Sequence, residues 1–119
     1  MKGALLVALA ALVPAVGCGG HGGPTVNCPQ DLPAACPTTP PSFASDVKPI
    51  YDSVCTSCHA PGGQMGSVPL TTYAQIFGRR TTELTQIYDC VMPPVNGPPL
   101  SDAQRTTLMT WFVCDAPNN

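Results

Sequence analysis

Apolar residues recur at helical spacing shortly before the middle of the chain. Four of them follow the three- and four-residue steps of one helix face: Phe43, Val47, Ile50 and Val54. Pro49 lies inside this run, and proline cannot donate the backbone hydrogen bond of a helix interior. We therefore expect a helix that either begins near Lys48 or is kinked at Pro49, and that leads directly into Cys55.

Two short helices are predicted further along. The stretch LTTYAQIFGRR predicts a helix that is capped by Thr71 or Thr72 and ends at Gly78. The stretch TTELTQIYDC predicts another, with Thr81 or Thr82 at its start. Neither stretch shows the strict alternation of a β-strand.

The clearest helix signal is the stretch LSDAQRTTLMTWFVCDAP near the C-terminus. Ser101 followed by Gln104 is the pattern of a capping box. In such a box, the side chain of each residue accepts a hydrogen bond from the free backbone N–H of the other residue. Pro117 follows the end of the helix. The apolar residues that share one face of it are Leu108, Trp111 and Phe112.

The domain as a whole is expected to be all-α. The segment VMPPVNGPPL between the last two helices is too rich in proline to be regular, and no strand pattern occurs anywhere. We predict three to five short helices joined by long loops, in a domain that covers residues 42–119. A domain of this size is marginal by apolar burial alone, so a large apolar group is expected at its centre.

Residues 1–17 are expected to be a signal peptide of the lipoprotein type. Met1 and Lys2 give a basic start, and the residues that follow are nearly all apolar. The stretch PAVGCGG resembles the lipobox of bacterial lipoproteins, which are cleaved before the cysteine and carry lipid on it, here Cys18. Ordinary signal peptidase cleavage at the same bond is the alternative, since Ala15 and Gly17 are both small.

Residues 18–41 are rich in glycine and proline and predict a tether between the anchor and the domain. If the lipobox resemblance holds, Gly19 in place of Asp after Cys18 indicates the outer membrane, so we expect the domain on the periplasmic side of the cell envelope. Export permits disulfides. The net charge is −2 and there is no basic stripe, so no nucleic acid partner is expected.

The stretch CTSCHAPGG carries the candidate chemistry. Cys55, Cys58 and His59 form the pattern C-x-x-C-H, the attachment signature of a c-type haem: two thiols add to the porphyrin, and the imidazole binds iron. A zinc site would need a second pair of ligands, but there is no other C-x-x-C, and His21 lies in the glycine-rich segment. A thioredoxin-like redox pair would need a βαβ setting. We therefore expect one covalent haem.

The sixth iron ligand is expected to be Met92. It precedes two prolines in the stretch CVMPPV, which stiffen the chain around it, and it lies far enough from His59 for the chain to wrap the haem. Met65 is only the second choice, because it follows His59 too closely in the sequence to reach the opposite face of the haem easily. Met109 lies in a helix beside Trp111, where a core position is expected.

These segments together resemble a known family. VKPIYDSVCTSCHAPGG, LTTYAQI and CVMPPVNGPPLSDAQRTTLMTWFVC are similar to class I c-type cytochromes, and most of all to small monohaem lipoprotein cytochromes of Gram-negative bacteria. The resemblance covers about residues 43–117. It implies covalent haem on Cys55 and Cys58, with His59 proximal and Met92 distal. It also implies a fold in which the first and last helices cross beside the haem.

Four cysteines remain after these assignments, and they allow three pairings. Proximity in sequence favours Cys28–Cys36 within the tether, which leaves Cys90–Cys114. The latter bond would connect the segment of Met92 to the end of the last helix. A pair at these two positions is not a general feature of the family.

The pocket is expected to be apolar. We predict that Leu70, Leu100 and Leu108 line it, and that Trp111 either stacks near the porphyrin or belongs to the core. Arg79 and Arg80 either pair with haem propionates or lie at a solvated helix end. No role is assigned to Tyr73 or Tyr88.

The expected function is electron transfer. Two axial ligands close the iron to substrate, so we expect a one-electron carrier and not an enzyme, with redox proteins of the envelope as partners and the membrane reached through the lipid. Two alternatives stay open. One is a sensor or peroxidase-like protein with an open sixth position, and the other is an electron-transfer subunit of a larger dehydrogenase complex.

Overall fold

The computed structural model describes residues 28, 29 and 31–119. The expected signal peptide, the lipid site at Cys18, His21 and the first part of the tether lie outside these residues. Among the described residues, no helix has the length and apolar character needed to span a membrane.

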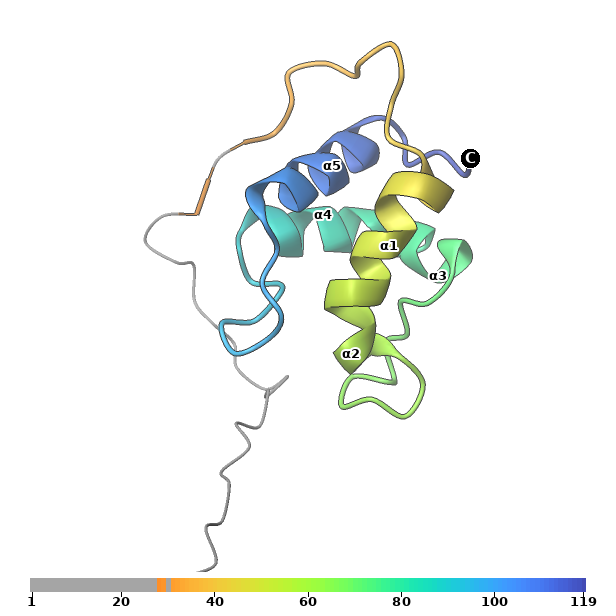
Figure 1. The fold of residues 1–119 in the computed structure, drawn as a ribbon, viewed down its shortest axis with the longest axis vertical. Coiled ribbons are helices and arrows are strands. Elements are labelled where there is room, and N and C mark those ends of the chain that lie inside the picture. The colour runs from red at the N-terminus through yellow and green to blue at the C-terminus, as the bar shows by residue number, and fades with distance from the viewer. Residues whose placement is uncertain (1–27, 30) are drawn as a thin grey trace, which may run out of the picture.

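The prediction of an all-α domain is confirmed, because the described part of the chain contains helices and no strand (Figure 1). A continuous helical run comprises η1 (Phe43–Val47), α1 (Lys48–Ile50), η2 (Tyr51–Cys55) and α2 (Thr56–His59), in which η marks wider, π-helical turns. Three further helices follow: α3 (Tyr73–Phe77), α4 (Arg80–Tyr88) and α5 (Asp102–Val113).

The first helix begins at Phe43, and Pro49 lies within it. The wide turns of η1 precede the proline: Val47 donates its backbone N–H to the carbonyl of Ser42, and Lys48 donates to that of Phe43, each five residues back. A π-helical turn inserted in an α-helix changes the register of the backbone hydrogen bonds. The run therefore continues through the proline and reaches the C-x-x-C-H motif, as expected.

The capping residues lie where the sequence indicated. Thr72 accepts a hydrogen bond from the backbone N–H of Gln75, whose side chain bonds back, and Ser101 and Gln104 form the same box at α5. These contacts satisfy N–H groups that have no partner inside the helix. Helix α4 begins at Arg80, slightly earlier than predicted.

The core lies where the first helix crosses α5. Trp111 is fully buried, its ring centroid lies 5.8 Å from that of Phe43, and its indole N–H donates to the carbonyl of Pro117 at 3.0 Å. Tyr73 packs edge-on against Phe43 at 5.1 Å, and its hydroxyl donates to the carbonyl of Ala116 at 2.9 Å. These contacts fix the crossing helices and bring the C-terminal segment back to the start of the fold.

Two disulfides between described residues fasten the segment from Cys28 to Cys36 to the domain. Cys28 is bonded to Cys90 and Cys36 is bonded to Cys114, so the expected pairs Cys28–Cys36 and Cys90–Cys114 are wrong. The reason is spatial: the segment runs alongside α5 (Figure 1), which brings each of its cysteines to a different part of the domain. The described part of the expected tether is therefore attached to the domain at both cysteines.

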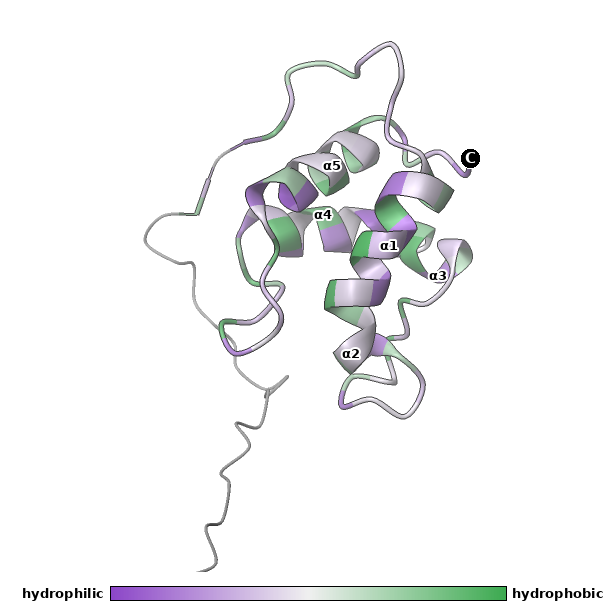
Figure 2. Ribbon diagram, viewed as in Figure 1, coloured by the Kyte–Doolittle hydropathy of each residue, from purple (hydrophilic) through white to green (hydrophobic). Residues whose placement is uncertain are grey.

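Helix α4 is amphipathic, and Figure 2 shows hydrophobic and hydrophilic residues along it. Ile87 is buried in the core, and Leu84 and Tyr88 pack against the same core. Because residues three and four apart share a helix face, these residues form one apolar stripe. The polar residues of α4 are thereby left for other faces, one of which borders the cavity described next.

Candidate functional site

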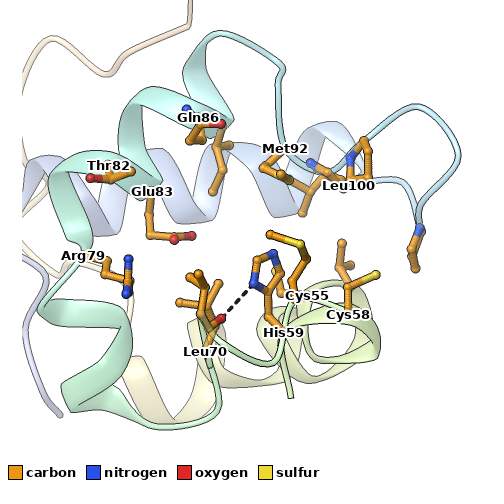
Figure 3. A pocket seen from close by; sticks show the side chains of 17 residues that line it. Cys55, Cys58, His59, Leu70, Arg79, Thr82, Glu83, Gln86, Met92 and Leu100 are labelled. Atoms are coloured by element: carbon orange, nitrogen blue, oxygen red, sulfur yellow. Dashed lines mark hydrogen bonds between the residues drawn. The ribbon is translucent and has the colours of Figure 1, made fainter. Parts of the chain in front are cut away.

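A cavity of about 240 Å³ lies between the end of the first helix, α4 and the proline-rich segment before α5. Figure 3 shows side chains that enter it from all three. Its wall is largely apolar, with residues that include Val54, Val68, Leu70, Ile87 and Leu100. A concave, mostly apolar pocket with a few polar groups is typical of a small-molecule or cofactor site.

Cys55, Cys58 and His59 all line the cavity. They lie on the last helical turns before the chain leaves α2, which brings the three side chains to the same wall (Figure 3). The loop that follows is tight. A Cβ on Gly63 would lie 2.4 Å from the carbonyl oxygen of Cys58, so only glycine permits this close approach.

The orientation of His59 is fixed by a backbone contact. Its Nδ1 lies 2.8 Å from the carbonyl oxygen of Val68, the bond drawn in Figure 3. Since a carbonyl oxygen can only accept, Nδ1 carries the hydrogen in this bond, and Nε2 is the ring nitrogen with a lone pair whenever the imidazole is neutral. The backbone of the same loop is also held, because Leu70 donates its N–H to the carbonyl of His59 at 2.9 Å. Metal-ligating histidines commonly make such a bond through their second ring nitrogen.

The environment of Cys55 disfavours a thiolate. Burial, and secondly the nearby carboxylate of Glu83, raises the pKa of this thiol to about 12. The sulfur of Cys55 is therefore a neutral thiol in this wall. Nowhere among the described residues do three side chains of His, Cys, Asp or Glu gather as a metal-binding group.

Met92 lines the cavity from the loop after α4. Figure 3 shows it on the wall opposite His59. Its own N–H and that of Val91 both donate to the carbonyl of Gln86, at 3.0 and 2.9 Å, which ties the loop back to α4. The disulfide of Cys90 holds the loop from its other side. We call residues 90–94 the Met92 loop.

The other methionines differ in their positions. Met65 also lines the cavity but is 36% exposed. Met109 is fully buried in the core, as expected, and does not line the cavity. A second cavity of about 280 Å³ lies behind the Met92 loop, between Pro29 and Arg105.

Helix α4 contributes a polar wall that sequence reasoning missed in part. Arg79, Thr82, Glu83 and Gln86 line the cavity (Figure 3). Their spacing of three, four and seven residues places them on one helix face. The signal was present in the sequence, since this face follows once the apolar stripe of α4 is assigned to the core. Of these four residues, a cofactor contact is predicted from the sequence only for Arg79.

Glu83 is the acidic group of this wall. The hydroxyl of Tyr51 lies 3.5 Å from Oε2 of Glu83 and donates to it. Burial raises the pKa of Glu83, while the Tyr51 hydrogen bond and the charge of Arg79 act in the opposite direction. The pKa of Tyr51 is raised well above its ordinary value by burial and by the negative charge of Glu83. The tyrosine therefore stays a neutral donor.

The expected pocket residues divide into two groups. Leu70 and Leu100 line the cavity, whereas Leu108 and Trp111 do not and are fully buried in the core. Arg79 faces the cavity. Arg80 instead places its guanidinium 4.3 Å from the centre of the Phe77 ring.

Comparison of the chain with protein-family models, with curated proteins and with solved structures gives no match. The functional assignment therefore depends on the side chains of the cavity.

Proposed function

We propose that this protein is a monohaem c-type cytochrome that carries one electron at a time. Cys55 and Cys58 would bind the haem through thioether bonds, and His59 and Met92 would be its axial ligands. The observation that carries the proposal is the convergence of these four side chains, from two distant segments, on one largely apolar cavity.

The donor set fits this cofactor. His59 offers Nε2 because Nδ1 is engaged by Val68, and Met92 offers a thioether from the opposite wall. Thioether bonds need no thiolate in the final state, which agrees with the raised pKa of Cys55. A c-type haem supplies an iron that changes its charge by one electron, and a methionine ligand raises its reduction potential.

The chain's own residues limit what the site can do. Hydrogen bonds from Val91 and Met92 to Gln86, and the disulfide of Cys90, hold the Met92 loop against the cavity. The apolar part of the wall, with Val54, Val68 and Leu70, would limit the access of water to a bound cofactor. Both features favour outer-sphere electron transfer over binding of a substrate. We propose redox proteins of the cell envelope as partners, and a lipid at Cys18 as the membrane anchor.

Optical spectra of the secreted, matured protein test the proposal. The pigment should stay with the polypeptide in acidified organic solvent, because thioether bonds are covalent. The oxidised protein should show the weak far-red band of a sulfur–iron bond. Met92→Ala should abolish that band, and Met65→Ala, a change at the other methionine of the same cavity, should leave it intact.

Four results would contradict the proposal. A colourless matured protein would exclude the haem, and extractable pigment would exclude the covalent attachment. Loss of the far-red band in Met65→Ala, together with its retention in Met92→Ala, would show that Met65 is the axial ligand and Met92 is not. Rapid binding of carbon monoxide by the reduced wild type would indicate an open-site sensor or a peroxidase-like protein instead.

A further inference from the structure

Glu83 has no task in the electron carrier described above, although it lies in the wall of its cavity. Of the described residues that line the cavity, it is the one carboxylic acid. Figure 3 shows its carboxylate directed from α4 into the cavity, on the side where His59 enters it. A half-buried carboxylic acid at this position interacts electrostatically with any charge that the cavity acquires, and its pKa changes accordingly.

The groups around Glu83 leave it as the proton acceptor. On η2, Tyr51 donates a hydrogen bond to it at 3.5 Å, and Cys55 faces it as a neutral sulfur. Arg79, one turn earlier on the same face of α4, keeps its positive charge. His59 lines the cavity with its Nδ1 bonded to Val68, and an iron-bound Nε2 would have no proton to exchange. Glu83 can therefore change its charge while Tyr51 and Cys55 stay neutral.

We propose that Glu83 takes up a proton when the protein is reduced and releases it when the protein is oxidised, an inference that rests on the proposed function. An external one-electron donor supplies the electron, and solvent water supplies the proton. The carboxylate becomes a carboxylic acid, so one negative charge enters the cavity and one is neutralised there. Electron uptake and proton uptake thereby balance in charge.

The physical reason is the low polarity of the site. A bound cofactor would displace water from the cavity, which strengthens electrostatic interactions inside it. The oxidised state carries one more positive charge and favours the carboxylate. The reduced state loses that charge, so the cost of burying the carboxylate is no longer offset. Burial already raises the pKa of Glu83, and reduction acts in the same direction.

A redox titration of the holoprotein over a range of pH tests this coupling. The midpoint potential of the wild type should fall as pH rises between the pKa of Glu83 in the oxidised state and that in the reduced state. Its slope should not exceed about 59 mV per tenfold change in proton concentration, the limit for one proton per electron. Outside that window, the potential should be constant.

Two variants and a control complete the test. Glu83→Gln should remove the pH dependence while the far-red band and the covalent pigment remain. Asp89→Asn, which changes an exposed carboxylate at the end of α4, should leave the dependence unchanged. Tyr51→Phe removes a hydrogen bond that lowers the pKa of Glu83, so the window should move to higher pH.

The outcomes separate this inference from the proposed function. If Glu83→Gln keeps the spectra and also keeps the full slope, the proton resides on another group, such as a haem carboxylate, and the inference is overturned. If Glu83→Gln does not mature, the Tyr51→Phe variant decides instead. A pH window of the midpoint potential that is the same in Tyr51→Phe as in wild type would also overturn the inference. A wild type without covalent pigment or without the far-red band contradicts the proposed function instead.

Discussion

Asp31 and Arg105 form a two-pronged ion pair that joins the segment before the first helix to α5. Nε and Nη2 of Arg105 both donate to the carboxylate of Asp31, at distances of 3.0 to 3.1 Å, across 74 residues of sequence. The guanidinium also donates to the carbonyls of Pro29, Ile87 and Tyr88. Arg105 is only 7% exposed, and these contacts satisfy a charge that would otherwise be costly to bury.

The ion pair should contribute measurably to stability. We expect Asp31→Ala to lower the free energy of unfolding by about 1–3 kcal/mol, because the buried guanidinium loses its counter-charge. This range lies below that of a fully buried pair, since the side chain of Asp31 is 31% exposed. Urea titration of the oxidised holoprotein, with its disulfides intact, measures the effect.

An exposed pair provides the matched control. Asp52 is bonded to Lys48 one turn away on the first helix, with side-chain exposures of 51% and 34%. Asp52→Ala should cost no more than about 0.5 kcal/mol. Equal losses in the Asp52 and Asp31 variants would contradict the structural role of Arg105.

The disulfide pairing can be checked by mapping peptides without reduction. Cleavage before aspartate separates Cys28 from Cys36, because Asp31 lies between them. We expect the peptide 31–45 to be linked to the peptide that contains Cys114. The peptide that ends at Gln30 should be linked to the one that contains Cys90. Detection of the exchanged links by mass spectrometry would exclude this arrangement.

Removal of the Cys28–Cys90 bond should loosen the Met92 loop. Cys90 lies two residues before Met92, so we expect the double variant Cys28→Ser with Cys90→Ser to bind carbon monoxide at least tenfold faster in the reduced state than wild type. The measurement is the rate of the spectral change after mixing with carbon monoxide.

The second disulfide is the control for this experiment. Its loss, in Cys36→Ser with Cys114→Ser, should destabilise the fold by a similar amount, about 4 kcal/mol in the chain-entropy model, because the loops have comparable separations of 62 and 78 residues. It should leave carbon monoxide binding slow. If both double variants bind the gas equally fast, the effect is general destabilisation and not release of the loop.

Substitution of Leu108 should affect stability, whereas substitution of Leu100 should affect the absorption spectrum. Leu108 is fully buried away from the cavity, so Leu108→Ala should lower the free energy of unfolding by about 2–5 kcal/mol and leave the visible spectrum unchanged. Leu100 is half-buried in the cavity wall, so Leu100→Ala should cost less stability and alter the spectrum. Urea titration and absorption spectra of the two variants, side by side, distinguish core from pocket. A spectral change in Leu108→Ala alone would place the cofactor beside Leu108 and not in the cavity.

Local features were predictable from the sequence. The capping boxes of Thr72 with Gln75 and of Ser101 with Gln104 involve neighbours three residues apart, so their residue types are enough to indicate them. The same holds for Cys55, Cys58 and His59, which one helical turn places on one wall. The apolar face of α5 also follows from spacing alone, and its members are buried.

Distance along the chain was a poor guide to the remaining contacts. The entropic cost of closing a loop grows only slowly with its length, so a short separation barely favours Cys28–Cys36 over a partner in a distant segment. The course of the segment beside α5 decides the matter, and it brings Cys28 to Cys90 and Asp31 to Arg105.

The sequence by itself determined the helices, their caps and the position of the C-x-x-C-H motif, because these depend on residues within one or two helical turns of each other. The tertiary structure decided which helix faces meet around the cavity. It placed Met92 opposite His59, put Glu83 in the wall and left Trp111 in the core. These positions follow from the packing of helices against one another, and spacing within a single helix does not specify its neighbours.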